Sequence, residues 1–291
     1  MSAREAPDVH AAPGWLGRRT VTGQLAREPA FLVGGFIVLL FVLVALFAPW
    51  VAPYDPNASD WMAIRQAPSA AHWFGTDDLG RDVLSRVIFG ARASLAAGFL
   101  SVAIAMAFGA PLGLVAGYFG GIPDIIISRL MDALLACPFL VLAIALAAFL
   151  GPSLQNAMIA IGVSAMPVFA RLARGQTLAV RAEDYVSAAV SVGLSHPKIL
   201  VAYVLPNIMP PIVVQAALTT AIAVLAEASL AFLGLGQLPP APSWGSMLDA
   251  ARQFLIEAPW MAIWPGLAIV TVVIGFNMLG DALNDALNPR D

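Results

Sequence analysis

The chain has 291 residues, of which 60% are hydrophobic and only 11% are charged. A soluble domain carries about 25% charged residues, so this composition excludes an ordinary soluble protein and indicates a membrane protein. The net charge of −3 is small, and the single cysteine, Cys137, excludes a disulfide or a cysteine-based metal site within the chain.

Five stretches without any Asp, Glu, Lys or Arg are long enough to cross a bilayer core, which takes about 20 helical residues. The third stretch is too long for one crossing and is divided by Gly151, Pro152 and Ser153. We therefore expect an all-α, polytopic membrane protein with six transmembrane helices. The expected spans are residues 31–50, 94–116, 130–150, 155–173, 206–233 and 259–281.

Residues 1–30 are polar and basic, and the apolar run that follows is longer than the core of a signal peptide. We therefore expect the first span, 31–50, to be retained. With the N-terminus inside, ten of the fifteen Lys and Arg residues fall on the inner side. This bias predicts that the segment 1–30 and the tail 282–291 are both cytoplasmic.

An outer segment, 51–91, follows the first span and contains no long apolar run. Gly75 and Gly80 predict turns in it. Near its end, Val83, Val87 and Ile88 share one face of a helix, which predicts an amphipathic helix lying on the outer membrane surface.

The remaining five spans form one predicted unit, 92–281, that is rich in Ala and Gly. Small residues let helix backbones approach closely in lipid. Pro111, Pro138 and Pro167 lie inside predicted spans and can kink them. A kinked bundle of this kind suits a gate, but static membrane proteins share these features, so the pattern leaves both interpretations open.

A polar loop interrupts the apolar spans, and we place it at 174–205. Glu183 and Asp184 favour the start of a short helix, and Gly193 favours its end in a left-handed conformation. Ala188 and Ala189 would form a bare surface between them. Ser195 then predicts the start of a second helix. Such a loop can fit a groove of a cytosolic partner, or it can be an ordinary amphipathic connector.

The run DYVSAAVSVGLSHPKILVAYVLP, which begins at Asp184, resembles the cytoplasmic loop signature of permease subunits of ABC importers. It departs from that signature at Ser187, where an acid is usual, and at Tyr203, where Ile is usual. The matching positions are Ala188, Ala189, Gly193, Leu205 and Pro206.

Four further segments resemble the C-type permeases of the dipeptide, oligopeptide and nickel importers. They read HWFGTDDLGRDVLSRVIFGARASL, GYFGGIPDIIISRLMDALLACPFLVLAI, LAEASLAFLGLG and NMLGDALNDALNPRD. The resemblance implies the type I importer permease fold, with an outer loop after the first helix. It also implies a coupling site formed by Glu183, Asp184, Tyr185, Ala188, Ala189, Gly193, Leu205 and Pro206.

The partners that the resemblance implies are a second, homologous permease in a heterodimer, one or two cytoplasmic ABC ATPase subunits and an extracytoplasmic substrate-binding protein. ATP and Mg would be bound by the ATPase, with no cofactor in this chain and no nucleic acid. The chain has no GxxxxGK phosphate loop and no HExxH or CxxC motif. We therefore expect a non-enzymatic subunit in a bacterial or archaeal plasma membrane.

Peptides are the expected substrate, with nickel or another small solute as the alternative. A secondary transporter that needs no ATPase is the rival function, but it would predict inverted repeats or broken helices at mid-membrane. Glu227 lies within the fifth span, where a carboxylate normally faces the bundle interior or water. It either lines the translocation pathway or makes a structural hydrogen bond to a neighbouring span. Arg171 and Arg174 are expected to reach lipid headgroups or the ATPase.

Overall fold

The computed structural model describes residues 28–287, so most of the predicted segment 1–30 and the end of the tail 282–291 lie outside the described residues. Within 28–287 the chain is helical, and its one β pairing is an isolated bridge between Thr76 and Asp82. The helices are α2 (Pro29–Leu46), α3 (Ala48–Val51), α4 (Val83–Phe119), α5 (Gly121–Leu135), α6 (Phe139–Leu150), α7 (Leu154–Arg181), α8 (Asp184–Ser191), α9 (His196–Ile199), the π-helix η2 (Leu200–Val204), α10 (Leu205–Phe232), α11 (Trp244–Ala251), the 3₁₀-helix η3 (Arg252–Phe254) and α12 (Trp260–Leu287).

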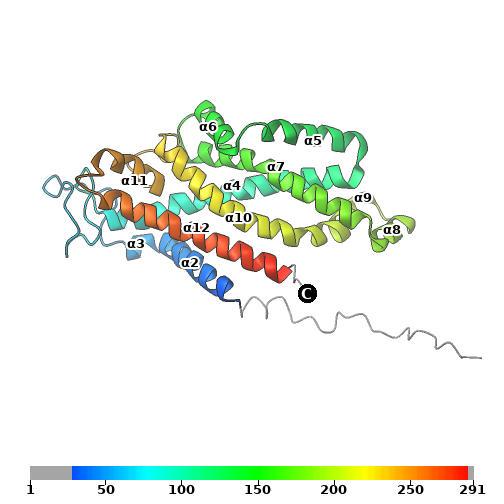
Figure 1. Cartoon of the computed structure of the whole chain (residues 1–291), viewed down its shortest axis with the longest axis horizontal. Helices are drawn as coiled ribbons and strands as arrows, with labels where there is room; N and C mark the ends of the chain where they lie inside the picture. Colours follow the sequence, from blue (N-terminus) through cyan, green and yellow to red (C-terminus); the bar gives the residue numbers. More distant parts are fainter. Residues whose placement is uncertain (1–27, 288–291) are drawn as a thin grey trace, which may run out of the picture.

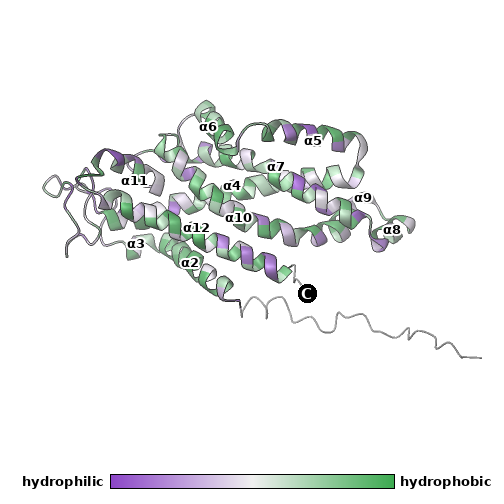
Figure 2. Cartoon of the chain, in the orientation of Figure 1, coloured by the Kyte–Doolittle hydropathy of each residue, from purple (hydrophilic) through white to green (hydrophobic). Residues whose placement is uncertain are grey.

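The long helices α2, α4, α7, α10 and α12 run along the long axis of the molecule (Figure 1). One end gathers α3, α11 and the segment 52–82. The opposite end carries α8 and α9, and the start of α2 and the last turns of α12 point toward that side without reaching it. The middle of the bundle is predominantly hydrophobic (Figure 2). Within the described residues, five helices are long and apolar enough to cross a membrane, or six if the bent pair α5–α6 counts as one span.

The closest helix contact joins α4 to α7, which run side by side in the same direction. Gly109, Gly113 and Gly117 of α4 face the α7 backbone at successive turns. A Cβ on Gly109 would lie 2.5 Å from the Met166 carbonyl oxygen, and one on Gly113 would lie 2.1 Å from the Ala170 carbonyl oxygen. Only glycine permits this spacing, so the GxxxGxxxG pattern sets the distance between the two helices.

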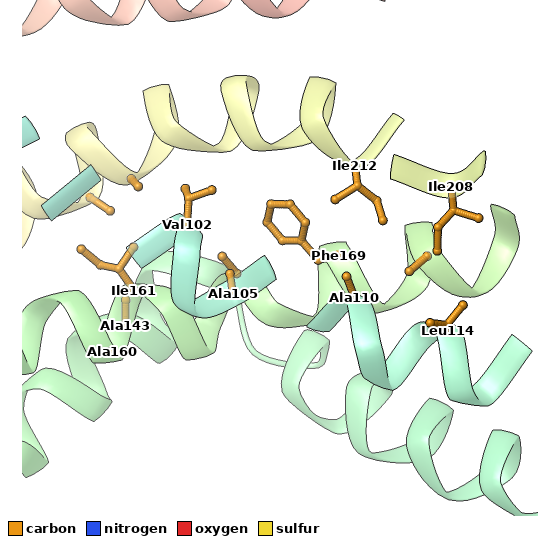
Figure 3. Close-up of a cluster of buried hydrophobic side chains, with 14 of the residues drawn as sticks. Val102, Ala105, Ala110, Leu114, Ala143, Ala160, Ile161, Phe169, Ile208 and Ile212 are labelled. Atoms are coloured by element: carbon orange, nitrogen blue, oxygen red, sulfur yellow. The ribbon is translucent and has the colours of Figure 1, made fainter. Parts of the chain in front are cut away.

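A core of buried aliphatic side chains surrounds this contact (Figure 3). Phe169 of α7 is fully buried between α4 and Ile212 of α10. At the opposite face of the bundle, α2 lies on α12, where a Cβ on Gly34 would meet the Gly275 carbonyl oxygen at 2.8 Å. Small residues therefore bring both pairs of helices close together.

The predicted third span, 130–150, is not a single helix. Its first half belongs to α5, which begins earlier, at Gly121, and is bent by 89° relative to α6. The break falls at Ala136–Pro138, because Pro138 has no N–H to donate and disfavours a helical conformation for Cys137. The sequence prediction missed the beginning of α5 because Asp124, inside this helix, interrupts the charge-free stretch.

The predicted amphipathic helix on the outer surface is also wrong. Val83 to Phe119 form one helix of 37 residues, about 55 Å long, that begins at the N-cap Asp82. Val83 and Ile88 are buried rather than turned to a membrane surface. Val83 packs against Met247 and Met261 at the α11 end. The predicted turns at Gly75 and Gly80 are confirmed, since both have positive φ.

Replacing Gly113 with Ala should destabilise the protein, because the new Cβ has no room beside the Ala170 carbonyl. Overpacking of this kind costs about 1–3 kcal/mol. Gly175→Ala on α7 is the matched control, since a Cβ there meets nothing within 4 Å. Thermal unfolding of the two purified variants in detergent measures the stability of each. Equal melting temperatures for the two variants would contradict the close α4–α7 contact.

Candidate functional site

The polar loop folds into two short helices, as expected. Glu183 occupies the N-cap of α8, and Asp184 lies in its first turn, where a negative charge interacts favourably with the helix dipole. The Ser187 backbone N–H donates to the Glu183 carbonyl oxygen at 3.2 Å, and this bond closes the first turn. The acidic pair therefore marks where α7 ends and α8 starts.

α8 has a buried face and an exposed face. Val186 and Ala189 are buried and belong to the main core, whereas Tyr185 is 41% exposed and Ala188 is also exposed. The prediction that both alanines form a bare surface is therefore wrong for Ala189. Adjacent residues of a helix are about 100° apart, so a face that presents Ala188 turns Ala189 toward the protein.

Gly193 ends α8 as predicted, with a φ of +77°. Its N–H donates to the Val190 carbonyl oxygen at 3.0 Å, and the Leu194 N–H donates to the Ala189 carbonyl oxygen at 3.2 Å. These two bonds form a Schellman motif. A Cβ on Gly193 would meet nothing within 4 Å, so glycine is required here for its backbone conformation and not for space.

The second loop helix, α9, begins after Ser195 and continues through η2 into α10, where Leu205 is half-buried and Pro206 lies in the first turn. His196 Nδ1 lies 2.9 Å from the Tyr118 hydroxyl at the end of α4. The loop is thus attached to α7 and α10 through the chain and to α4 through this hydrogen bond.

Glu227 lies far from the loop, near the end of α10 that meets α11. Its side chain is fully buried. The Ser94 hydroxyl of α4 donates to Glu227 Oε2 at 3.0 Å and accepts from the Trp244 backbone N–H of α11 at 3.2 Å. Glu227 thus makes the interhelical hydrogen bond that the sequence offered as one alternative. Its role in the translocation pathway stays a prediction.

Two ion pairs join α5 to α7. Arg174 donates from Nε and Nη2 to both carboxylate oxygens of Asp124, at 2.5 and 2.7 Å, and Arg171 donates to Asp132 Oδ1 at 2.7 Å. Both arginines therefore pair with α5, and their contact with headgroups or the ATPase stays a prediction. Asp124 and Asp132 are eight residues apart and share one helix face, a spacing that could have identified them as a pair.

Ser94→Ala should lower the stability of the bundle, because the hydroxyl makes two bonds between buried groups of three helices. Leaving such groups without partners costs about 1–3 kcal/mol. Ser229→Ala on α10 is the matched control, since that hydroxyl bonds only to the Leu225 carbonyl of its own helix. In detergent, the Ser94→Ala variant should have a lower melting temperature than Ser229→Ala. Equal melting temperatures would contradict a stabilising role for the bonds of Ser94 to Glu227 and Trp244.

Comparison with known families assigns two parts of the chain. Residues 109–290 match the family described as binding-protein-dependent transport system inner membrane component, and residues 19–68 match the N-terminal transmembrane domain of oligopeptide transport permease C. The chain resembles the methionine ABC transporter MetNI in inward-facing conformations, with a TM-score of 0.58 at 21% identity, over 70% of this chain and 97% of that one. This likeness shows the fold.

Full-length relatives give the same assignment. The chain is 47% identical to the dipeptide transport system permease protein DppC of Alkalihalophilus pseudofirmus, over 92% of this chain and 88% of the relative. It is 45% identical to the probable D,D-dipeptide transport system permease protein DdpC of Escherichia coli, over 92% and 90%. It is 43% identical to the glutathione transport system permease protein GsiD of Pectobacterium atrosepticum, over 92% and 89%.

Helix α2 lies within the first matched segment, 19–68, and the helices from α5 to α12 lie within the second, 109–290. The chain therefore belongs to the binding-protein-dependent inner-membrane components of ABC importers, as a permease of the C type found in dipeptide and oligopeptide systems.

Proposed function

We propose that this permease is one half of a heterodimer that takes up dipeptides or short oligopeptides by alternating access. The observation that supports this most directly is the 43–47% identity, along nearly the whole chain, to permeases named for dipeptides and glutathione. These names favour peptides over nickel or another small solute.

The α8–α9 loop is the proposed contact with a separate ATPase subunit on the cytoplasmic side. α8 presents Tyr185 and Ala188 outward, and Val192 at its C-cap is 75% exposed. Its opposite face is anchored in the core through Val186 and Ala189. A small apolar surface on a firmly held helix suits a groove in a partner, because docking then orders few flexible side chains.

Movement of this loop would reach the membrane by two routes. α9, η2 and α10 form one continuous apolar helical stretch, His196–Phe232, so displacement of the loop displaces α10 directly. The Tyr118–His196 bond transmits the same displacement to α4. ATP would be bound with Mg by the ATPase subunit, and its binding must favour one orientation of the spans, since a ligand shifts an equilibrium only through differential affinity.

The orientation follows from the same proposal. The α8–α9 end, with the start of α2 and the last turns of α12, would face the cytoplasm of a bacterial or archaeal cell. The α11 end, with the segment 52–82, would face outward and meet the substrate-binding protein. Trp260 Nε1 donates to the Thr76 carbonyl oxygen at 3.0 Å, and Phe74 stacks on Trp264 at 3.8 Å, so this outer segment is tied to α12.

Uptake of radiolabelled Ala-Ala into proteoliposomes tests this function. The complete transporter, with both permeases, the ATPase and the binding protein, should accumulate the dipeptide only when ATP is available to the ATPase. Accumulation by this chain alone, without ATPase or ATP, would show that it is a secondary transporter.

Gly193→Val should impair ATPase co-purification and Ala-Ala uptake, because a β-branched residue resists a φ of +77° at a cost of about 1–2 kcal/mol. Gly193→Asn is the matched variant, since Asn tolerates the left-handed conformation, and it should retain most of both activities. Wild-type ATPase binding and uptake by Gly193→Val would count against the loop as the coupling site.

A further inference from the structure

A cavity of about 400 Å³ opens between α4, α5 and α7. Gly113 and Ala116 of α4 are among the residues that line it. The rest of its lining combines four charged or polar side chains, Ser128, Asp132, Arg171 and Arg174, with the apolar Ile127, Met131 and Ala170. Hydrophilic positions on α5 and on the facing part of α7 are visible in Figure 2.

The Asp132–Arg171 pair lies some distance from the α8–α9 loop. Asp132 on α5 and Arg171 on α7 are each about 15 Å from the helix end nearest the α8–α9 loop, at a rise of about 1.5 Å per residue. Their side chains are nevertheless 49% and 58% exposed. Charged side chains as exposed as these face water or protein rather than lipid, because exposing a charge to lipid is costly. The cavity is therefore not a lipid-facing groove.

A second cavity beside the α4–α7 pair has the opposite character. It measures about 440 Å³ and is lined almost entirely by apolar side chains, among them Leu100, Phe108, Met158 and Ile159. Apolar walls suit lipid tails or the apolar surface of another subunit. The two cavities therefore differ in the environment that their side chains require.

The two ion pairs in the charged cavity are not equivalent. Asp124 and Arg174 make two parallel bonds and are 20% and 38% exposed, so they hold α5 against α7. Asp132 and Arg171 share one bond and are more exposed. A carboxylate and a guanidinium joined in this way can each exchange their partner for a ligand group of the opposite charge.

α5 itself allows the cavity to open. Met131 is the one α5 side chain that is buried. Gly120, just before the helix, and Gly121, its first residue, both have positive φ, and the 89° bend follows the helix. With few packing contacts to break, α5 can move away from α7 at low cost.

We propose that this cavity is a water-filled section of the substrate path, where Asp132 binds the ammonium group and Arg171 binds the carboxylate of a passing peptide. The proposal rests on the peptide-uptake function above. A free peptide carries both charges, and an ammonium and a carboxylate match the two side chains once their mutual bond opens. Asp124 and Arg174 remain paired as positioning residues.

Thiol labelling tests whether the cavity holds water. In the complete transporter carrying Cys137→Ala, Ser128→Cys should react with a membrane-impermeant methanethiosulfonate at least about tenfold faster than Ile159→Cys, because the thiolate forms in water and not in lipid. Ile159 is 43% exposed but lies on the apolar cavity, which makes it a stringent control. Equal rates, or faster labelling at position 159, would overturn the water-filled path.

The ratio of Ala-Ala uptake to Ala-Ala amide uptake tests whether Arg171 binds the peptide carboxylate, which the amide lacks. The same binding protein is present throughout, so a change in this ratio reports on the permease. Arg171→Gln should lower the ratio about tenfold, the size expected for losing one charge-assisted bond, whereas Arg171→Lys should preserve it. Asp124→Asn should reduce uptake of both probes by the same factor.

An Arg171→Gln transporter that loses both probes equally would overturn the contact and leave Arg171 as a structural residue only. Failure of the wild-type transporter to take up either probe would instead refute the peptide-uptake function. The two failures are therefore distinguishable in one set of assays.

Discussion

The backbone contact between α4 and α7 is the constraint on which the rest of the structure depends. Three glycines at four-residue spacing let two parallel helices approach until backbone faces backbone. In lipid the hydrophobic effect contributes little to helix association, so this packing, repeated over several turns, is what holds the bundle together. α10 completes the core through Ile208 and Ile212, which pack against both helices of the pair (Figure 3).

The two ends of this helix pair carry different chemistry. At one end α7 leads directly into α8, and the last turn of α4 bonds to α9 through Tyr118 and His196, so the loop rests on both helices. At the other end Ser94 and Glu227 join α4, α10 and α11 through buried hydrogen bonds. Because the pair between them is closely packed, the proposed displacement of the loop would move whole helices rather than be absorbed locally.

α5 and α6 depart from this rigid arrangement. Glycines at the start of α5 and the bend at Pro138 separate it from its neighbours in the chain, and it is held by two ion pairs to α7 and one buried side chain, Met131. An ion pair that faces water can break and re-form because water replaces the lost partner. The close packing at the glycines has no such replacement when the helices separate. The molecule therefore combines a closely packed frame with one weakly packed element.

Local signals in the sequence determined the apolar spans, the start of α8 at Glu183, its left-handed end at Gly193 and the loop motif that identifies the family. These features depend on hydropathy and on residues within a few positions of one another, which a sequence shows directly. Tertiary structure alone decided that Val83 begins a buried, 37-residue helix, that Ala189 turns inward, and that Arg171 and Arg174 pair with α5. The partners in those pairs are 39 and 50 residues apart in the chain, and Glu227 meets Ser94 across 133 residues. Such contacts depend on how helices are placed in space, which local composition does not specify.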